Sequence, residues 1–279
     1  MFADADDAQH ASPSEEPTPQ SAWQQRQWHM FEMDDDNPKQ MHAHPRYTPE
    51  QALVVLENTA APLDERIEAL VLLIEQFEAP YFARFYALAE NPQESTDVRG
   101  ALMLALAKMA HESDVDALRE NVLILLLPVI QGEASPLRPL AIEALGRLHL
   151  PEALATLVNA LNDPDGEVFS AAAEALGQMG HMAQEALLNV LTQGADDARC
   201  VAAWKLGELG HAAAVPALAH AVQHDPSEDV VALAIWALGE IGTTQQGAIE
   251  ALEWARAQAS PALNERAKLA LKKVARHLN

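Results

Sequence analysis

The sequence is poor in cysteine and in positive charge, and both shortages exclude functions. It contains one cysteine, Cys200, so it cannot form an internal disulfide. Lysines and arginines number 18 against 41 aspartates and glutamates, which gives a formal net charge of −23. A chain this acidic repels phosphate backbones and anionic lipid headgroups, and no basic cluster offsets the repulsion. We therefore expect neither nucleic acid nor a membrane surface as a partner.

Glycine and aromatic residues are also scarce, and their scarcity favours helices. The chain has 12 glycines and 5% aromatic residues, whereas apolar residues, with alanine and leucine in long runs, make up 49%. Alanine and leucine are among the best helix formers, and β-branched residues are too thinly spread for a strand-rich fold. The composition predicts an all-α fold.

No segment reads as a membrane span or a signal peptide. The most apolar run, Val122–Ile130, is too short to cross a bilayer. Residues 1–7 are acidic and lack the basic and apolar regions of a signal peptide. Together with the single cysteine, this predicts a cytoplasmic protein.

The composition changes near residue 48. Residues 1–47 are rich in Asp, Glu, Gln, Ser and Pro and show no sustained apolar period, so we expect a disordered acidic tail. Apolar islands around Trp23, Trp28 and Phe31 suggest a docking motif within it. Residues 48–279 form the second predicted domain.

The start of that domain carries a helix signal. Thr48 can cap a helix, Pro49 suits its first turn, and Gln51 completes a capping box. From there the chain reads as one helical pattern after another, broken by short polar turns.

Four segments of the second domain read almost alike, and each contains a glycine after an Ala-Leu or Lys-Leu pair. These glycines, 31, 30 and 32 residues apart, are Gly146, Gly177, Gly207 and Gly239. A unit of this length holds two helices of about 12 residues and their turns. With weaker copies on both sides, including a long helix near Asp116–Ile130, we predict seven helix pairs in an α-solenoid.

The glycines of each unit have different predicted roles. Gly180, Gly210 and Gly242 stand just past the second helix, where a left-handed cap favours glycine. The first glycine of each unit is predicted in mid-helix, where it costs roughly 1 kcal/mol relative to alanine. Close packing of neighbouring helices would explain why that cost is tolerated.

The segment Asp163–Gly177, with Asp-Pro-Asp, then Val, then Ala-Ala-Glu-Ala-Leu-Gly, resembles the short HEAT-like repeats of phycobilin lyases. The resemblance covers roughly residues 50–279 and implies a right-handed α-solenoid. It implies no single function, because this repeat type occurs in scaffolds, lyase subunits and an iron hydroxylase. Relatives often place an arginine after the Val; Arg99 has it, but Phe169 and Val231 interrupt any ladder of such arginines.

Counting from each first glycine, positions three before and one after lie on one helix face. The resemblance to HEAT architecture puts second helices on the concave side. The candidate groove residues are Glu143, Glu174, Trp204, Glu208, Trp236 and Glu240. We interpret them as an acidic groove with a two-tryptophan platform for a basic or aromatic-bearing peptide. In the alternative interpretation both tryptophans pack between helices and the glutamates form a solvated face.

The sequence gives little support for an enzyme. Deoxyhypusine hydroxylase, which has similar repeats, holds iron through His-Glu pairs, and none occupies the corresponding slots here. The one His-Glu pair, His111-Glu112, is solitary and expected in a turn. We expect no metal, no cofactor and no catalytic residues. A scaffold or accessory factor that binds a partner protein is the favoured function; a subunit of a bilin lyase-like enzyme is the alternative.

Cysteine, histidine and methionine are the remaining residue types that could carry chemistry. Cys200 is interpreted as a packing residue, with a nucleophile as the alternative because Arg199 could lower its pKa. Histidines and methionines of the tail could hold Cu(I), but their spacing matches no compact site. His181, His211 and His220 fall near turns or helix starts and are expected at the surface.

Overall fold

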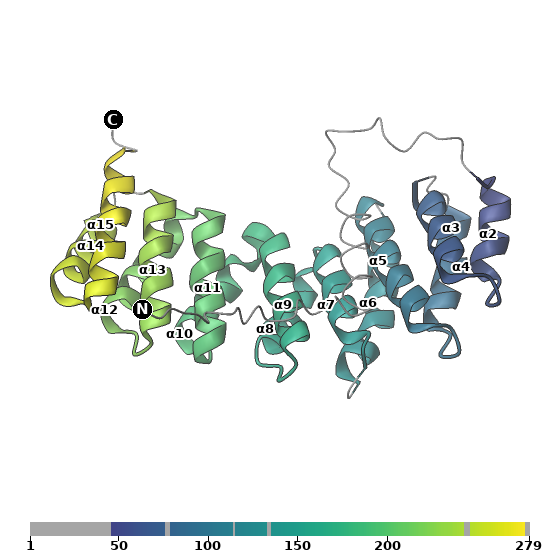
Figure 1. The fold of residues 1–279 in the computed structure, drawn as a ribbon, viewed down its shortest axis with the longest axis horizontal. Helices are drawn as coiled ribbons and strands as arrows, with labels where there is room; N and C mark the ends of the chain where they lie inside the picture. The colour runs from purple at the N-terminus through teal and green to yellow at the C-terminus, as the bar shows by residue number, and fades with distance from the viewer. Residues whose placement is uncertain (1–45, 76–78, 114, 133–134, 243–245, 277–279) are drawn as a thin grey trace, which may run out of the picture. The chain divides into compact units, whose positions relative to one another are not determined.

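The computed structural model describes residues 46–75, 79–113, 115–132, 135–242 and 246–276. These residues contain fourteen α-helices and no strand (Figure 1). The helices are α2 (Pro49–Glu57), α3 (Leu63–Glu75), α4 (Ala79–Glu90), α5 (Thr96–Glu112), α6 (Asp116–Gln131), α7 (Arg138–Arg147), α8 (Leu154–Ala160), α9 (Gly166–Gln178), α10 (Gln184–Gln193), α11 (Asp196–Leu209), α12 (Val215–His224), α13 (Glu228–Ile241), α14 (Gln246–Gln258) and α15 (Pro261–Arg276). Residues 1–45, and with them the predicted tail and its docking motif, lie outside the described part.

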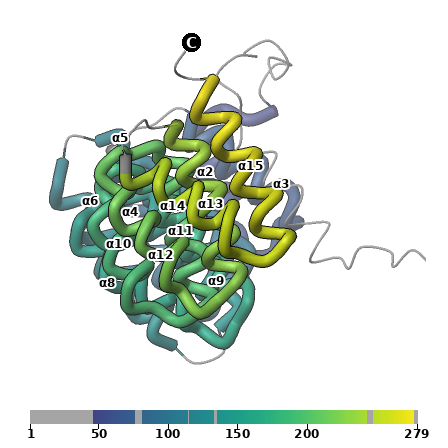
Figure 2. The backbone as a smooth tube through the Cα atoms, turned by 90° about the vertical axis from the view of Figure 1, so that its left-hand side faces the viewer, coloured from purple at the N-terminus to yellow at the C-terminus, as the bar shows by residue number. Residues whose placement is uncertain are grey.

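Consecutive helices form seven pairs, from α2 with α3 to α14 with α15. The second helices of successive pairs contact one another in chain order, and so do the first helices from α8 to α14. Figure 2 shows the two layers, with α8 and α10 on one side and α9, α13 and α15 on the other. The fold is the predicted right-handed α-solenoid. The long helix expected near Asp116–Ile130 is α6.

Helix ends follow the predicted chemistry. Thr48 Oγ1 accepts a hydrogen bond from the Gln51 backbone N–H, and Gln51 Oε1 accepts one from the Thr48 N–H, so the capping box is confirmed. Gly180, Gly210 and Gly242 have left-handed backbones, with φ of 56°, 67° and 60°. They are the left-handed residues that the repeat predicted.

The first glycine of each unit lies in the last turn of its second helix, not in mid-helix as predicted. The expected reason for it is nevertheless confirmed. A Cβ atom on Gly146 would stand 2.5 Å from the Ala175 Cβ, and one on Gly207 would stand 2.8 Å from the Ala237 Cβ. Glycine on one helix and alanine on the next therefore let the second helices approach closely, around a core of fully buried alanines and leucines.

Arginines tie the pairs together at the other end of the second helices. Each donates to a backbone carbonyl at the end of the first helix of its own pair: Arg66 to Leu56, Arg99 to Ala89, Arg138 to Ile130 and Arg199 to Gly194. Three of them also reach a carboxylate in the next pair: Arg66 binds Glu94, Arg138 binds Asp163 and Arg199 binds Asp225.

The sequence identified only Arg99 in this ladder and correctly placed Phe169 and Val231 as its interruptions. Arg66, Arg138 and Arg199 stand in the same register but were not recognised, because their units depart from the repeat around them. Each carbonyl at a helix end lacks a partner within its own helix, so an arginine that supplies one stabilises both helices of the pair.

We predict that Gly146→Ala lowers the free energy of unfolding by about 1–3 kcal/mol, because the new Cβ meets backbone and Cβ atoms of Ala175 that cannot rotate away. Denaturant unfolding measures the change. Gly247→Ala is the control, since a Cβ there meets nothing within 4 Å. Equal effects of the two substitutions would contradict the packing explanation.

The ion pair of Arg66 and Glu94 gives a second prediction, since both side chains are buried and 2.7 Å apart. Hydrogen bonds from Arg66 hold the pKa of Glu94 below its ordinary value of 4.5. The pair therefore stabilises the fold above that pH, and the contribution is lost as the pH falls through the lowered pKa. Glu94→Gln should lower the free energy of unfolding by about 3 kcal/mol at neutral pH and progressively less in acid.

Urea unfolding of the wild type and this variant over a pH series checks the prediction. The exposed Glu120 offers a control, because Glu120→Gln should leave the stability almost unchanged at every pH. A Glu94→Gln deficit that persists undiminished in acid would contradict the role assigned to the ionised pair.

Candidate functional site

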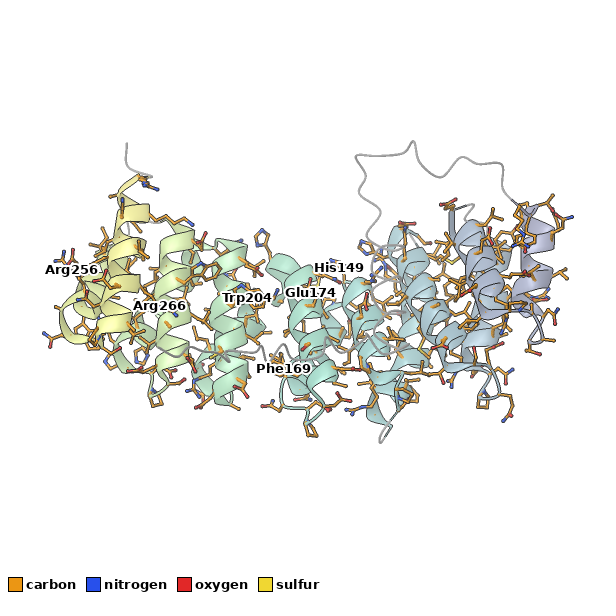
Figure 3. All side chains as sticks on the ribbon, in the orientation of Figure 1. His149, Phe169, Glu174, Trp204, Arg256 and Arg266 are labelled. Atoms are coloured by element: carbon orange, nitrogen blue, oxygen red, sulfur yellow. The ribbon has the colours of Figure 1, made fainter. Side chains whose placement is uncertain are left out.

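The structure brings the six predicted groove residues onto four neighbouring second helices. Glu143 lies on α7, Glu174 on α9, Trp204 and Glu208 on α11, and Trp236 and Glu240 on α13. Figure 3 labels Glu174 and Trp204, which lie on facing sides of α9 and α11. The register predicted from the glycines therefore places these side chains along the second-helix layer.

The two tryptophans occupy the same repeat position but have different environments. Trp236 is half-buried, and its Cζ3 atom stands 2.7 Å from the place where a Cβ of Gly207 would be. Trp204 is 39% exposed. The expected two-tryptophan platform is thus one exposed ring on α11 and one ring packed onto the preceding helix.

Lys205 explains the difference. Most units have alanine two residues before the glycine, as at Ala175 and Ala237, and this alanine packs on the glycine of the preceding unit. Lys205 takes that position in α11, so its stem covers Gly177, with Nζ 3.0 Å from the place of a Cβ there. Because Gly177 is already covered, the Trp204 ring does not pack on it and remains exposed.

The ammonium group of Lys205 is buried with three partners. The residue is 4% exposed, and its Nζ lies 3.3 Å from Glu174 Oε2 and 3.0 Å from Glu208 Oε2. The same atom stands 4.1 Å from the centroid of the Trp204 ring. A buried lysine without such partners would carry a large desolvation penalty, so the two carboxylates and the ring offset that cost.

The remaining glutamates of the predicted groove also have cationic partners. Glu143 binds Arg147 at 2.7 Å, and Glu240 binds Lys273 of α15. The face is therefore less acidic than the sequence suggested, with one carboxylate in excess at the cluster of Glu174, Lys205 and Glu208. Sequence reasoning missed Lys205 and Lys273; the departure from alanine at position 205 was the available signal for the first.

The junction of α9 and α11 also differs from the others in this layer. Among neighbouring second helices in the described ranges, these two share the smallest contact. Lys205 replaces the close glycine–alanine approach, and Phe169, labelled in Figure 3, leaves α9 without a ladder arginine. We call this junction the α9–α11 joint.

The structure removes the argument for a nucleophile at Cys200, which was the alternative to a packing residue, and it corrects the position predicted for His111 and Glu112. Burial raises the pKa of the Cys200 thiol, and Asp229 and Asp197 raise it further, so the lowering effect of Arg199 is outweighed. His111 and Glu112 are the last two residues of α5 and do not lie in a turn. In the described residues, no group of three or more His, Cys, Asp or Glu side chains could hold a metal ion. No helix there is long and apolar enough to cross a membrane.

A family profile described as HEAT repeats matches residues 125–198 and 184–272, together just over half of the chain. The chain belongs to the HEAT-repeat family. Its repeats include all four helices that carry the candidate site, so the site lies on the most regular part of the array. No curated protein matches the chain in a sequence comparison.

Several solved structures are similar to this HEAT-repeat chain. An archaeal HEAT-like repeats protein from Thermococcus onnurineus is 16% identical, covers 84% of this chain and 99% of its own, and gives a TM-score of 0.50. The CpcE–CpcF complex of a phycocyanin lyase from Nostoc is 19% identical, with 88% of this chain and 93% of that chain covered and a TM-score of 0.43. Human deoxyhypusine hydroxylase is 21% identical, with 82% of this chain and 96% of that chain covered and a TM-score of 0.35. At these identities the likeness concerns the fold alone.

We predict that the fold needs the stem of Lys205 and not its charge. Lys205→Met should change the free energy of unfolding by less than about 1 kcal/mol, because the stem is kept and Glu174 and Glu208 can be hydrated at the surface. Lys205→Ala should cost about 2 kcal/mol or more, because it leaves a gap above Gly177. Denaturant unfolding compares them, and equal losses would contradict the prediction.

Proposed function

We propose that this HEAT-repeat protein is an interaction scaffold that binds a segment of a partner protein across α9, α11 and α13, with Trp204 as the anchor. One observation carries the proposal: the Trp204 ring is 39% exposed on the second-helix face, although Trp236, at the same position in the next pair, packs against the preceding helix. Tryptophan is enriched among the residues that dominate binding energy at protein interfaces. A ring already held by Lys205 on one side loses little freedom when a partner covers it.

The charges around Trp204 favour a basic segment. Glu174 and Glu208 are exposed and share one cation between them, so one negative charge is left over. The net charge of −23 adds a long-range attraction for cations and speeds their approach. Arginine suits such a place, because its guanidinium can stack on an aromatic ring and bind a carboxylate at once.

Other parts of the sequence interpretation stay predictions. A role as an accessory or assembly factor, the phycobilin-lyase type of the repeat and a docking motif around Trp23, Trp28 and Phe31 go beyond the family and the fold. A cytoplasmic location belongs with them and rests on the single cysteine together with the sequence of residues 1–7 and the shortness of the apolar runs. A bilin lyase-like activity has no observation of its own in the described residues and is not proposed.

Selection of peptides from a random display library against the full chain tests the proposal. We expect enrichment of peptides with arginine or lysine beside an aromatic residue. Trp204→Ala should weaken their binding by about 30-fold or more, which corresponds to about 2 kcal/mol. Calorimetric titration gives the affinities, and binding should weaken further as salt is raised.

Trp254 supplies a matched control. It lies on α14, in the first-helix layer, and is 38% exposed, so Trp254→Ala removes the same side chain at the same exposure. Its affinity for the selected peptides should equal that of the wild type. If both substitutions weaken binding equally, or if no peptide is enriched, Trp204 is not the anchor of a binding site. Unfolding curves of both variants exclude a loss through misfolding.

A further inference from the structure

Two histidines stand at equivalent positions on either side of the α9–α11 joint. His181 follows Gly180 at the end of α9, and His211 follows Gly210 at the end of α11. Both glycines are left-handed, so the chain leaves the two helices in the same sense. The repeat therefore places two imidazoles that are 30 residues apart in sequence next to each other beside the joint.

The two rings make a T-shaped contact with centroids 4.0 Å apart, and this contact brings together the nitrogens that can bind metals. His181 Nε2 and His211 Nε2 are 3.3 Å apart, and the ring planes make an angle of 66°. Two nitrogens that each lie about 2.0–2.1 Å from a tetrahedral ion are separated by about 3.3 Å. Without an ion the two nitrogens lie at the long end of hydrogen-bond distance, where one neutral ring donates and the other accepts. His181 is exposed and His211 half-buried, so the rings have room to turn their lone pairs toward a common point.

We propose that His181 and His211 bind one divalent transition-metal ion through their Nε2 atoms, with water at the remaining positions. Neutral imidazole suits Zn²⁺, Cu²⁺ and Ni²⁺, whereas Mg²⁺ and Ca²⁺ prefer oxygen ligands. The ion bridges two pairs of helices where the second helices share their smallest contact. Binding therefore fastens the α9–α11 joint.

The other histidine pairs of the described residues are arranged differently. His111 and His149 stack with centroids 4.5 Å apart, but both ring nitrogens of His149 face backbone carbonyls, at 3.1 and 3.0 Å. His220 and His224 lie one turn apart on α12, within one helix, so an ion there would join no two pairs. Substitution of His220 is therefore a matched control.

Thermal unfolding of the untagged full chain with Zn²⁺ or Ni²⁺ tests the proposal. At about 100 times the dissociation constant, the ion should raise the Tm by about 5 °C. His220→Gln, which breaks the i, i+4 histidine pair of α12, should keep the rise, and in that background His181→Gln and His211→Gln should each abolish it. Mg²⁺ should leave the Tm unchanged, which separates imidazole binding from attraction to the acidic surface.

A second measurement identifies the ligands directly, because residues 1–45 also contain histidines that could bind ions without affecting the joint. In histidine-selective ¹⁵N spectra Zn²⁺ should shift the Nε2 signals of His181 and His211, and the shift of His181 should be lost in His211→Gln. A Tm that does not respond to Zn²⁺ or Ni²⁺ would overturn the proposal, and so would an undiminished response in His211→Gln. In either case the two imidazoles are only neighbours.

Discussion

The close approach of second helices, glycine on one against alanine on the next, sets the form of the array from α7 to α15, except at the α9–α11 joint. It constrains the repeat length, because each unit needs a small residue at the position that packs on the glycine of the preceding unit. It also fixes which side chains lie on the same face, because every other position is measured from that contact. At the α9–α11 joint a lysine replaces the alanine, and the unusual features of the molecule gather there: a buried ammonium, an exposed tryptophan and a small interhelical contact.

Much of the fold could be predicted from the sequence, because the repeat is written in residues that act locally. The left-handed glycines, the cap at Thr48 and the seven pairs all follow from short-range chemistry. The candidate site was harder. The spacing placed Trp204 and Trp236 in equivalent positions, but the exposure of each ring depends on the preceding helix. Trp236 packs on Gly207, whereas Gly177, the glycine that precedes Trp204, is covered by Lys205. Such contacts between units cannot be derived from the spacing of the sequence repeat alone.

Charge was the property that the sequence described least well. The total of −23 is correct, yet it says nothing of where cations lie. The few arginines are concentrated at carbonyl ends and between pairs, and Lys205 and Lys273 neutralise much of the face that had seemed acidic. Scarce cations in an acidic chain thus serve mainly as links within the fold. Among the four predicted groove glutamates, those beside Trp204 share one cation and keep an excess negative charge, which is why binding is proposed there and not along the whole face.

The position of the α9–α11 joint determines how far a rotation there would move the ends of the array. Four pairs of helices precede it and three follow, and its two second helices share a smaller contact than any other neighbouring second helices in the described ranges. Packed helices are about 8–10 Å apart, so three pairs make an arm of roughly 30 Å, and a rotation of about 10° at its base would carry the tip through roughly 5 Å. Any rotation at this joint would therefore become a larger displacement at the far end of the array.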